Sequence, residues 1–137
     1  MSEPIRVLIA DDQPKVRQGL GAVLTTFGMR ASQADPAVSV VGEAANGAEV
    51  IQLVQARQPD VVLMDAHMPG MDGPQATRYI KLHWPAVRII VLTMYANYRT
   101  AALSASADDF LLKGCDVADL LSTIQNKVAY GFGANER

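Results

Sequence analysis

Five side chains that could together handle a phosphoryl group are spread along this sequence, each near the end of a short apolar run. They are an adjacent pair of acids, a third acid, a hydroxyl and an ammonium: Asp11, Asp12, Asp65, Thr93 and Lys113. Carboxylates at close quarters repel one another, and a divalent cation with oxygen ligands removes that repulsion. Mg²⁺ suits a site with few carboxylates because it keeps several of its waters. The acids therefore predict a Mg²⁺ site, provided that folding brings them together.

The other groups of this set indicate transfer of a phosphoryl group. A bound Mg²⁺ that faces an ammonium forms a pocket for a phosphoryl group, whose transfer depends on positioning and on neutralising charge. Asp65 as the acceptor would form an acyl phosphate, a known kind of covalent intermediate. The Thr93 hydroxyl could then donate a hydrogen bond to one phosphoryl oxygen, and Lys113 could pair with another.

Each of these residues also has a simpler explanation when it is taken alone. Asp11 and Asp12 could cap a helix, since Asp is a common N-cap. Asp65 could be a turn residue, Thr93 is a good strand former, and Lys113 could be a surface charge. Asp65 is the hardest of them to explain this way, because an acid directly after Val61–Met64 should lie near a buried strand end. The joint pattern, with every group at the end of an apolar run, strengthens the functional interpretation.

Alternating apolar runs and amphipathic segments predict the elements that position these groups. The expected strands cover Ile5–Ala10, Val38–Val41, Val61–Met64, Ile89–Leu92 and Phe110–Leu112. Near-continuous apolar runs of this length are typical of strands buried on both faces of a parallel sheet. The expected helices cover Pro14–Leu24, Gly47–Gln58, Pro74–His83, Tyr98–Ala105 and Val117–Val128, with Asp72 and Asp116 as N-caps.

Five successive strand–helix units predict an α/β fold with a five-stranded parallel sheet, doubly wound in three layers by right-handed crossovers. In such folds ligands bind at the carboxyl ends of the strands. If the first, third, fourth and fifth strands are neighbours, all five side chains meet at that edge. The segment Thr25–Pro36 is longer than most connections in compact α/β domains. Its sequence is compatible with a longer first helix or with a surface loop.

Composition limits the class of protein. The chain has 137 residues, half of them hydrophobic, and a formal net charge of -2, which favours one globular domain and argues against a domain built to grip nucleic acid. Its one cysteine, Cys115, cannot form an internal disulfide. No secretion signal and no apolar run of the roughly 20 residues needed to span a membrane is evident. These features predict a soluble, cytoplasmic protein.

Several stretches of the sequence resemble the receiver domain of bacterial two-component response regulators. They are Val7–Asp12, Val61–Asp65, Met68–Gly73, Val91–Thr93 and Phe110–Lys113. The amino-acid sequence at residues 16–20, 40–47 and 92–95 is most similar to that of regulators with a LuxR-type DNA-binding output. The resemblance covers nearly the whole chain and implies a flavodoxin-like fold.

The resemblance also implies roles for particular residues. Asp65 would take a phosphoryl group from a sensor histidine kinase, and Asp12, Asp65 and the backbone carbonyl of His67 would hold Mg²⁺. Asp11 would reach the metal through water. Thr93 and Phe110 would respond to the phosphoryl group as switch residues. Such a domain promotes its own phosphorylation and dephosphorylation but is not an enzyme in the sense of turnover.

For the chain as a whole, the resemblance predicts a receiver domain over residues 1–130 and a tail or the start of a linker over 131–137. Too few residues follow Val128 for a helix-turn-helix. DNA would therefore be reached only through a C-terminal domain absent from this sequence, and transcription would be its output. No membrane partner is expected, and whether activation produces a homodimer stays open.

The sequence departs from the family pattern near its fourth helix and fifth strand. The interval from Thr93 to Lys113 is shorter than the family suggests, Ser106 and Asp109 stand where glycine is expected, and Gly114 stands where many receivers have proline. This is the face through which family members transmit their signal. We therefore expect the acidic site to be intact and the form of the response to be altered.

Three other functions are compatible with parts of the sequence. A receiver-like module could signal through protein contacts without phosphorylation, and the altered fourth-helix corner keeps this alternative open. A hydrolase with an aspartyl-phosphate intermediate would place an acid two residues after the nucleophile, where this chain has His67. A flavodoxin-like cofactor domain would need a phosphate-binding loop after the first strand, and the acids there would repel a phosphate.

Overall fold

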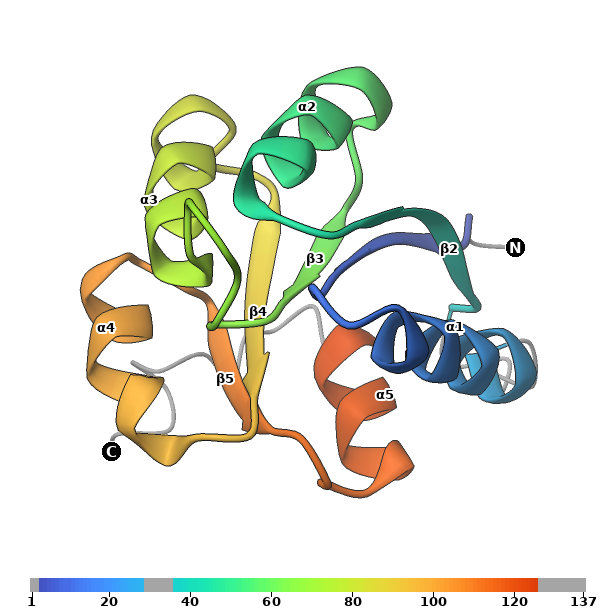
Figure 1. Ribbon diagram of the computed structural model, residues 1–137. Coiled ribbons are helices and arrows are strands. Elements are labelled where there is room, and N and C mark those ends of the chain that lie inside the picture. The colour runs from blue at the N-terminus through green and yellow to red at the C-terminus, as the bar shows by residue number, and fades with distance from the viewer. Residues whose placement is uncertain (1–2, 29–35, 126–137) are drawn as a thin grey trace.

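The computed structural model describes residues 3–28 and 36–125, which form a parallel sheet of five strands in the order β2-β1-β3-β4-β5 (Figure 1). The strands are β1 (Ile5–Ala10), β2 (Val38–Ala44), β3 (Val61–Met64), β4 (Arg88–Thr93) and β5 (Asp109–Leu112). The helices are α1 (Pro14–Gly28), α2 (Gly47–Arg57), α3 (Gly73–His83), the 3-10 turn η1 (Ala96–Tyr98), α4 (Arg99–Ser104) and α5 (Val117–Gln125).

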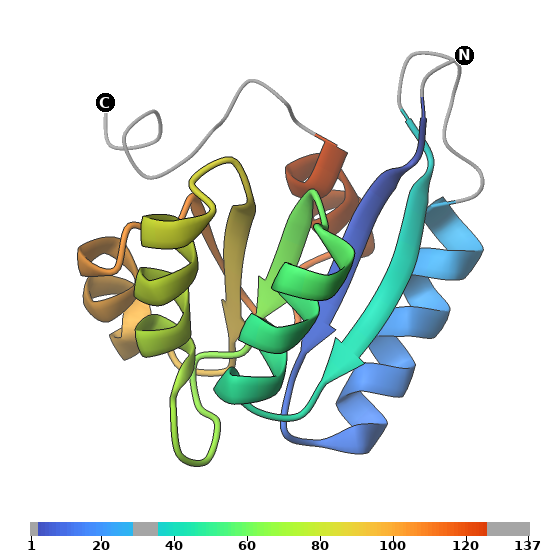
Figure 2. The same cartoon turned by 90° about the horizontal axis from the view of Figure 1, so that it is seen from above.

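Helices cover both faces of the sheet. α2, α3 and α4 lie on one side and α1 and α5 on the other, as the view from above shows (Figure 2). One buried apolar cluster contains Val54 of α2, Ile80 of α3 and Ala102 of α4. A second cluster contains Leu24 of α1 and Ile124 of α5. The predicted three-layer, doubly wound α/β fold is confirmed, and β1, β3, β4 and β5 are neighbours as the site requires.

All five predicted strands are present, and three of them are longer than predicted. β1 and β3 have the predicted bounds, and β4 and β5 are slightly longer than expected. β2 continues past Val41 to Ala44, because Gly42 and Glu43 interrupt the apolar run but keep pairing with β1 beyond a shift in register. β2 is an edge strand, and such a strand can carry polar residues on its open side.

The helix predictions differ mainly at the ends. α1 continues to Gly28, so the first part of the segment 25–36 extends the helix, while residues 29–35 lie outside the described residues. The helix expected from Tyr98 starts with η1, and only Arg99–Ser104 is α-helical. The last part of the final predicted helix and the tail at 131–137 also lie outside the described residues.

α3 begins at the cap that the sequence predicted. The Asp72 side chain accepts a hydrogen bond from the Gln75 backbone N–H at 2.9 Å, and the Gln75 side chain accepts one from the Asp72 N–H at 3.0 Å. This reciprocal pair is a capping box, which satisfies two free donors of the first turn. It fixes where α3 starts, and hence the length of the loop between β3 and α3. The cap at Asp116 stays a prediction.

Two of the unusual residues around β5 are explained by their backbone angles. Ser106 has a φ of 70°, in the left-handed region where glycine is favoured, so the chain keeps the turn that the expected glycine would make and accepts some strain. Gly114 has a φ of 95°. Proline cannot adopt that angle, because its ring holds φ near -65°.

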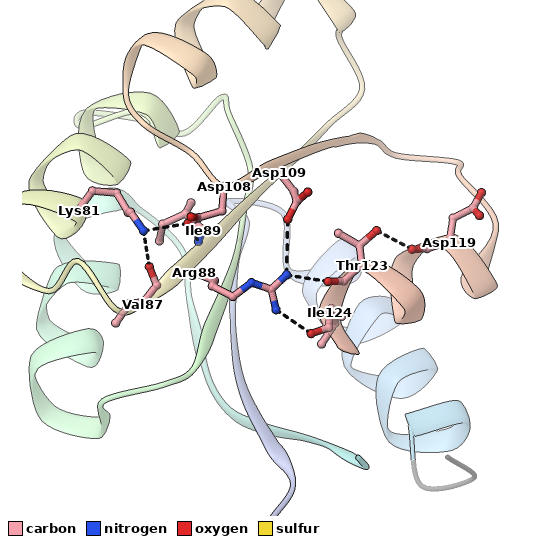
Figure 3. A network of polar contacts seen from close by, with 9 residues as sticks. All are labelled: Lys81, Val87, Arg88, Ile89, Asp108, Asp109, Asp119, Thr123 and Ile124. Atoms are coloured by element: carbon pink, nitrogen blue, oxygen red, sulfur yellow. Dashed lines mark hydrogen bonds and ion pairs between the residues drawn. The ribbon is translucent and has the colours of Figure 1, made fainter. Parts of the chain in front are cut away.

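Asp109, the other unexpected residue, belongs to a polar network at the amino ends of β4 and β5, far from the predicted site (Figure 3). Arg88 donates hydrogen bonds to the carbonyl oxygens of Thr123 and Ile124, at 2.7 and 2.9 Å, in the last described turn of α5. Its guanidinium also lies 3.5 Å from the carboxylate of Asp109. Arg88 therefore ties β4, β5 and α5 together.

The buried position of Asp109 makes the stability of the fold depend on pH. Burial raises the pKa of Asp109 to about 6, with Arg88 opposing and the neighbouring Asp108 adding to the rise. A folded-state pKa above the unfolded value means that this stabilising contribution is complete at low pH and is lost as the pH rises through about 6. Compared with Asp109→Asn, the free energy of unfolding of the wild type should fall by roughly 2–3 kcal/mol between about pH 4 and pH 7. Urea unfolding of both proteins across this range measures the difference, and a difference that does not change with pH would contradict the assignment.

Candidate metal and phosphoacceptor site

The three predicted acids converge at the carboxyl edge of the sheet. β1 and β3 are adjacent and parallel, so the residues that follow them, Asp11 and Asp65, lie side by side, and the Asp65 N–H donates to the Ala10 carbonyl at 2.9 Å. Asp11, Asp12 and Asp65 each offer a carboxylate oxygen within 4.8 Å of the others. Asp11 and Asp65 are buried, with 1% and 7% of their surface exposed. The geometric condition for the predicted Mg²⁺ site is met.

Among the described residues, Lys113 is the only lysine whose ammonium group contacts these acids. Its Nζ lies 2.5 Å from Oδ2 of Asp11 and 3.4 Å from Oδ1 of Asp65. It follows β5, and its backbone N–H donates to the Thr93 carbonyl at 2.7 Å, which anchors it to the end of β4. The Lys113 ammonium therefore contacts the two buried carboxylates of the group.

Burial and the neighbouring charges together shift the pKa of Asp65 and of Lys113. Burial raises the pKa of Asp65, and the negative charge of Asp11 adds to the rise, while Lys113 and the His67 backbone N–H lower it in part. For Lys113, burial disfavours the ammonium, but the hydrogen bond that Lys113 donates to Asp11 and the charges of Asp65 and Asp11 outweigh burial and raise its pKa. The acids keep Lys113 charged, and a further cation would relieve the repulsion that remains.

Thr93 lies beside the acids, as predicted. It is buried, and its hydroxyl oxygen accepts a hydrogen bond from the Tyr95 N–H at 3.3 Å, so its own proton is free to be donated. A pocket of about 290 Å³ opens over the group. Its lining holds five of the predicted residues, namely Asp12, Asp65, His67, Thr93 and Lys113, together with four that were not predicted, Gln13, Val16, Met94 and Tyr95.

The other two predicted residues lie at the margins of the site. The exposed side chain of His67 also lines the pocket, and its Nδ1 is 3.3 Å from the hydroxyl of Tyr98. Phe110 is half-buried and packs against the apolar cluster on the α2–α4 side of the sheet. Phe110 thus contributes to the core of the fold.

Arg17 supports the site and was missed by sequence reasoning. Its Nη1 donates to the Asp11 carbonyl at 2.6 Å, and its Nε lies 3.3 Å from the carboxylate of Glu43 at the end of β2. The side chain thus braces the turn that carries the acidic pair. A cation one turn into the helix after two acids is a usable signal, but which way it points depends on how α1 packs on the sheet.

Comparison with known proteins identifies the family. Residues 7–125 match the profile of the response regulator receiver domain. The chain is a receiver domain of this family. It is 38% identical over 123 residues to the transcriptional regulatory protein LiaR of Bacillus subtilis, which covers 88% of this chain and 54% of that protein. The receiver domain therefore spans about half of the length of the curated relatives it matches.

Solved structures extend the comparison. A LuxR-family two-component response regulator from Aurantimonas sp. SI85-9A1 is 32% identical and superposes with a TM-score of 0.76, over 89% of this chain and 83% of that one. The response regulator TrrA of Thermotoga maritima, solved in complex with Mg²⁺ and BeF, is 28% identical with a TM-score of 0.75, over 87% and 95% of the two chains. The predicted resemblance to LuxR-type receivers is confirmed.

None of the described helices is both long enough and apolar enough to cross a bilayer.

Proposed function

We propose that this receiver domain binds Mg²⁺ through Asp12, Asp65 and the backbone carbonyl of His67, with Asp11 acting through water, and that Asp65 accepts a phosphoryl group. The observation that supports this most directly is the convergence of three acids and Lys113 on one pocket. The donor set is all oxygen and carries more negative charge than Lys113 balances, which suits a hard divalent cation. When bound, Mg²⁺ would neutralise charge on the transferring group.

The chain's own residues then have separate tasks. One Asp65 oxygen forms a bond to phosphorus, while the bond from phosphorus to the nitrogen of a phosphohistidine donor breaks and its electron pair stays with that nitrogen. Lys113, which now pairs with Asp11 and Asp65, is within reach of a phosphoryl oxygen on Asp65. The Thr93 hydroxyl can donate to another oxygen. A new charge at the end of β3 thereby biases the residues that follow β4 and β5.

The alternatives fit the pocket less well. A module that signals without phosphorylation has no need for two buried carboxylates, which are costly to keep unless they are used. A hydrolase with an aspartyl-phosphate intermediate needs an acid beside the nucleophile, and the side chain at that position is the exposed imidazole of His67. The phosphoacceptor function is therefore the one that uses the whole set.

The proposal extends to the partners of the domain. The phosphoryl donor would be a sensor histidine kinase. The output would be transcription through a DNA-binding domain, which is consistent with the description of the relative LiaR as a transcriptional regulatory protein. The surface that changes would be that of η1, α4 and β5, where Tyr95 and Leu112 are exposed. Phe110, which lies in β5 beside that surface, would act as a switch residue.

The proposed function is tested by incubating the purified chain with acetyl phosphate and Mg²⁺. We expect the protein mass to increase by one phosphoryl group, no increase when EDTA replaces Mg²⁺, and assignment of the modification to Asp65 by peptide mapping. An unmodified protein, or modification of another residue, would refute the proposal. The EDTA arm separates the need for the metal from the identity of the acceptor.

A further inference from the structure

Tyr98 connects the two loops that border the proposed phosphoryl site. It is the last residue of η1 and is half-buried against the apolar cluster on the α2–α4 side of the sheet. Its hydroxyl lies 3.3 Å from Nδ1 of His67, which belongs to the loop between β3 and α3. The packed ring of Tyr98 in η1 thus holds the exposed imidazole of His67 in the loop between β3 and α3.

His67 has two backbone groups that matter to the site. Its N–H faces the Asp65 carboxylate and lowers the pKa of that group, and its carbonyl is the proposed Mg²⁺ ligand. An exposed imidazole that is not held samples several rotamers. A contact with a half-buried tyrosine restricts the imidazole, and through it the orientation of the His67 backbone carbonyl before the metal binds.

The same short segment also holds Thr93. The Tyr95 N–H donates to the Thr93 hydroxyl at 3.3 Å, and the Tyr98 N–H donates to the Tyr95 carbonyl at 3.2 Å. Three successive contacts therefore link Thr93 to Tyr95, Tyr95 to Tyr98, and Tyr98 to His67. The short segment from Tyr95 to Tyr98 thus contacts both Thr93 and His67.

We propose that Tyr98 is a positioning residue of the Mg²⁺ site, which acts by holding His67 through its hydroxyl group. This inference rests on the proposed function, since it assumes that the His67 carbonyl is a ligand. It separates two contributions of Tyr98: the ring packs in the core, and the hydroxyl orders the metal loop. Tyr98→Phe removes the second contribution and keeps the first.

The experiment compares Tyr98→Phe with the wild type in two measurements. In the absence of phosphoryl donor, Mg²⁺ is titrated while backbone amide resonances are followed. The dissociation constant should rise about two- to fivefold, the effect of losing one weak hydrogen bond. With acetyl phosphate, the Mg²⁺ concentration for half-maximal phosphorylation should rise by the same factor, while the rate at saturating Mg²⁺ stays unchanged. A residue that only stabilises the fold would lower the unfolding midpoint and would not shift the Mg²⁺ midpoint.

Two further variants make the assignment specific. His67→Ala keeps the backbone carbonyl but loses the imidazole, so it should produce the same shift, and the double variant should be no worse than either single one. Tyr79→Phe removes a hydroxyl from α3, where Tyr79 stacks on His83 away from the site, and should behave as the wild type. Additive shifts, or no shift in Tyr98→Phe, would overturn the inference while leaving Asp65 as the acceptor. A wild type that takes up no phosphoryl group would instead refute the proposed function.

Discussion

Asp65→Asn should reduce phosphorylation by acetyl phosphate to the background of a protein without the acceptor, because the amide is not a nucleophile toward phosphorus. The same change removes one of three clustered carboxylates, so Mg²⁺ affinity should fall as well. The fold should survive. In EDTA, the repulsion between Asp65 and Asp11 disappears while the long contact with Lys113 is lost. The two effects oppose each other, and the free energy of unfolding should change by about 1 kcal/mol or less.

The matched control for Asp65→Asn is the same substitution at the other end of the strand. Asp60 directly precedes β3, is exposed, and accepts a hydrogen bond from the Arg6 N–H at 2.8 Å, which an asparagine can also accept. Asp60→Asn should therefore be phosphorylated as the wild type is. Residual phosphorylation of Asp65→Asn at the wild-type rate would show that another residue is the acceptor.

Gly73→Ala should strongly destabilise the protein. Gly73 is the first residue of α3, and a Cβ at this position would lie 2.2 Å from the Asp65 carbonyl oxygen and 2.8 Å from the Ala66 Cα. Both neighbours are backbone atoms, so either α3 or the loop after β3 must move. We expect a loss of roughly 2–4 kcal/mol in urea unfolding. Because that loop carries Asp65, Mg²⁺ binding should weaken in the fraction that stays folded.

Gly19→Ala is the control for this prediction. Gly19 lies in the middle of α1, and a Cβ there would meet no atom within 4 Å. Alanine favours the helix over glycine by up to about 1 kcal/mol, so this variant should be as stable as the wild type or more stable. If Gly73→Ala unfolded at the same urea concentration as the wild type, α3 could not pack as closely on the loop after β3 as the structure shows.

The sequence alone indicated the strands and most of the helices, and it pointed to the acids of the candidate site. Apolar runs such as Val61–Met64 and the cap at Asp72 are local signals, since strand burial and helix capping depend on residues that are near one another in the chain. The acids are recognisable for the same reason, because each directly follows a run that must be buried. The sequence also marked Ser106 and Gly114 as departures from the family pattern. The positive φ at Ser106 explains why glycine is expected there, and the positive φ at Gly114 explains why proline is absent.

Tertiary structure decided which of these residues meet. Lys113 contacts Asp11 across 102 positions of sequence, a contact that exists only because β1, β3, β4 and β5 are adjacent in that order. The brace from Arg17, the pairing of Asp109 with Arg88 and the contact between Tyr98 and His67 also depend on how helices and turns pack on the sheet. Such contacts have no local signature, because the partner of a polar side chain is set by strand order, register and helix orientation rather than by its neighbours in the chain.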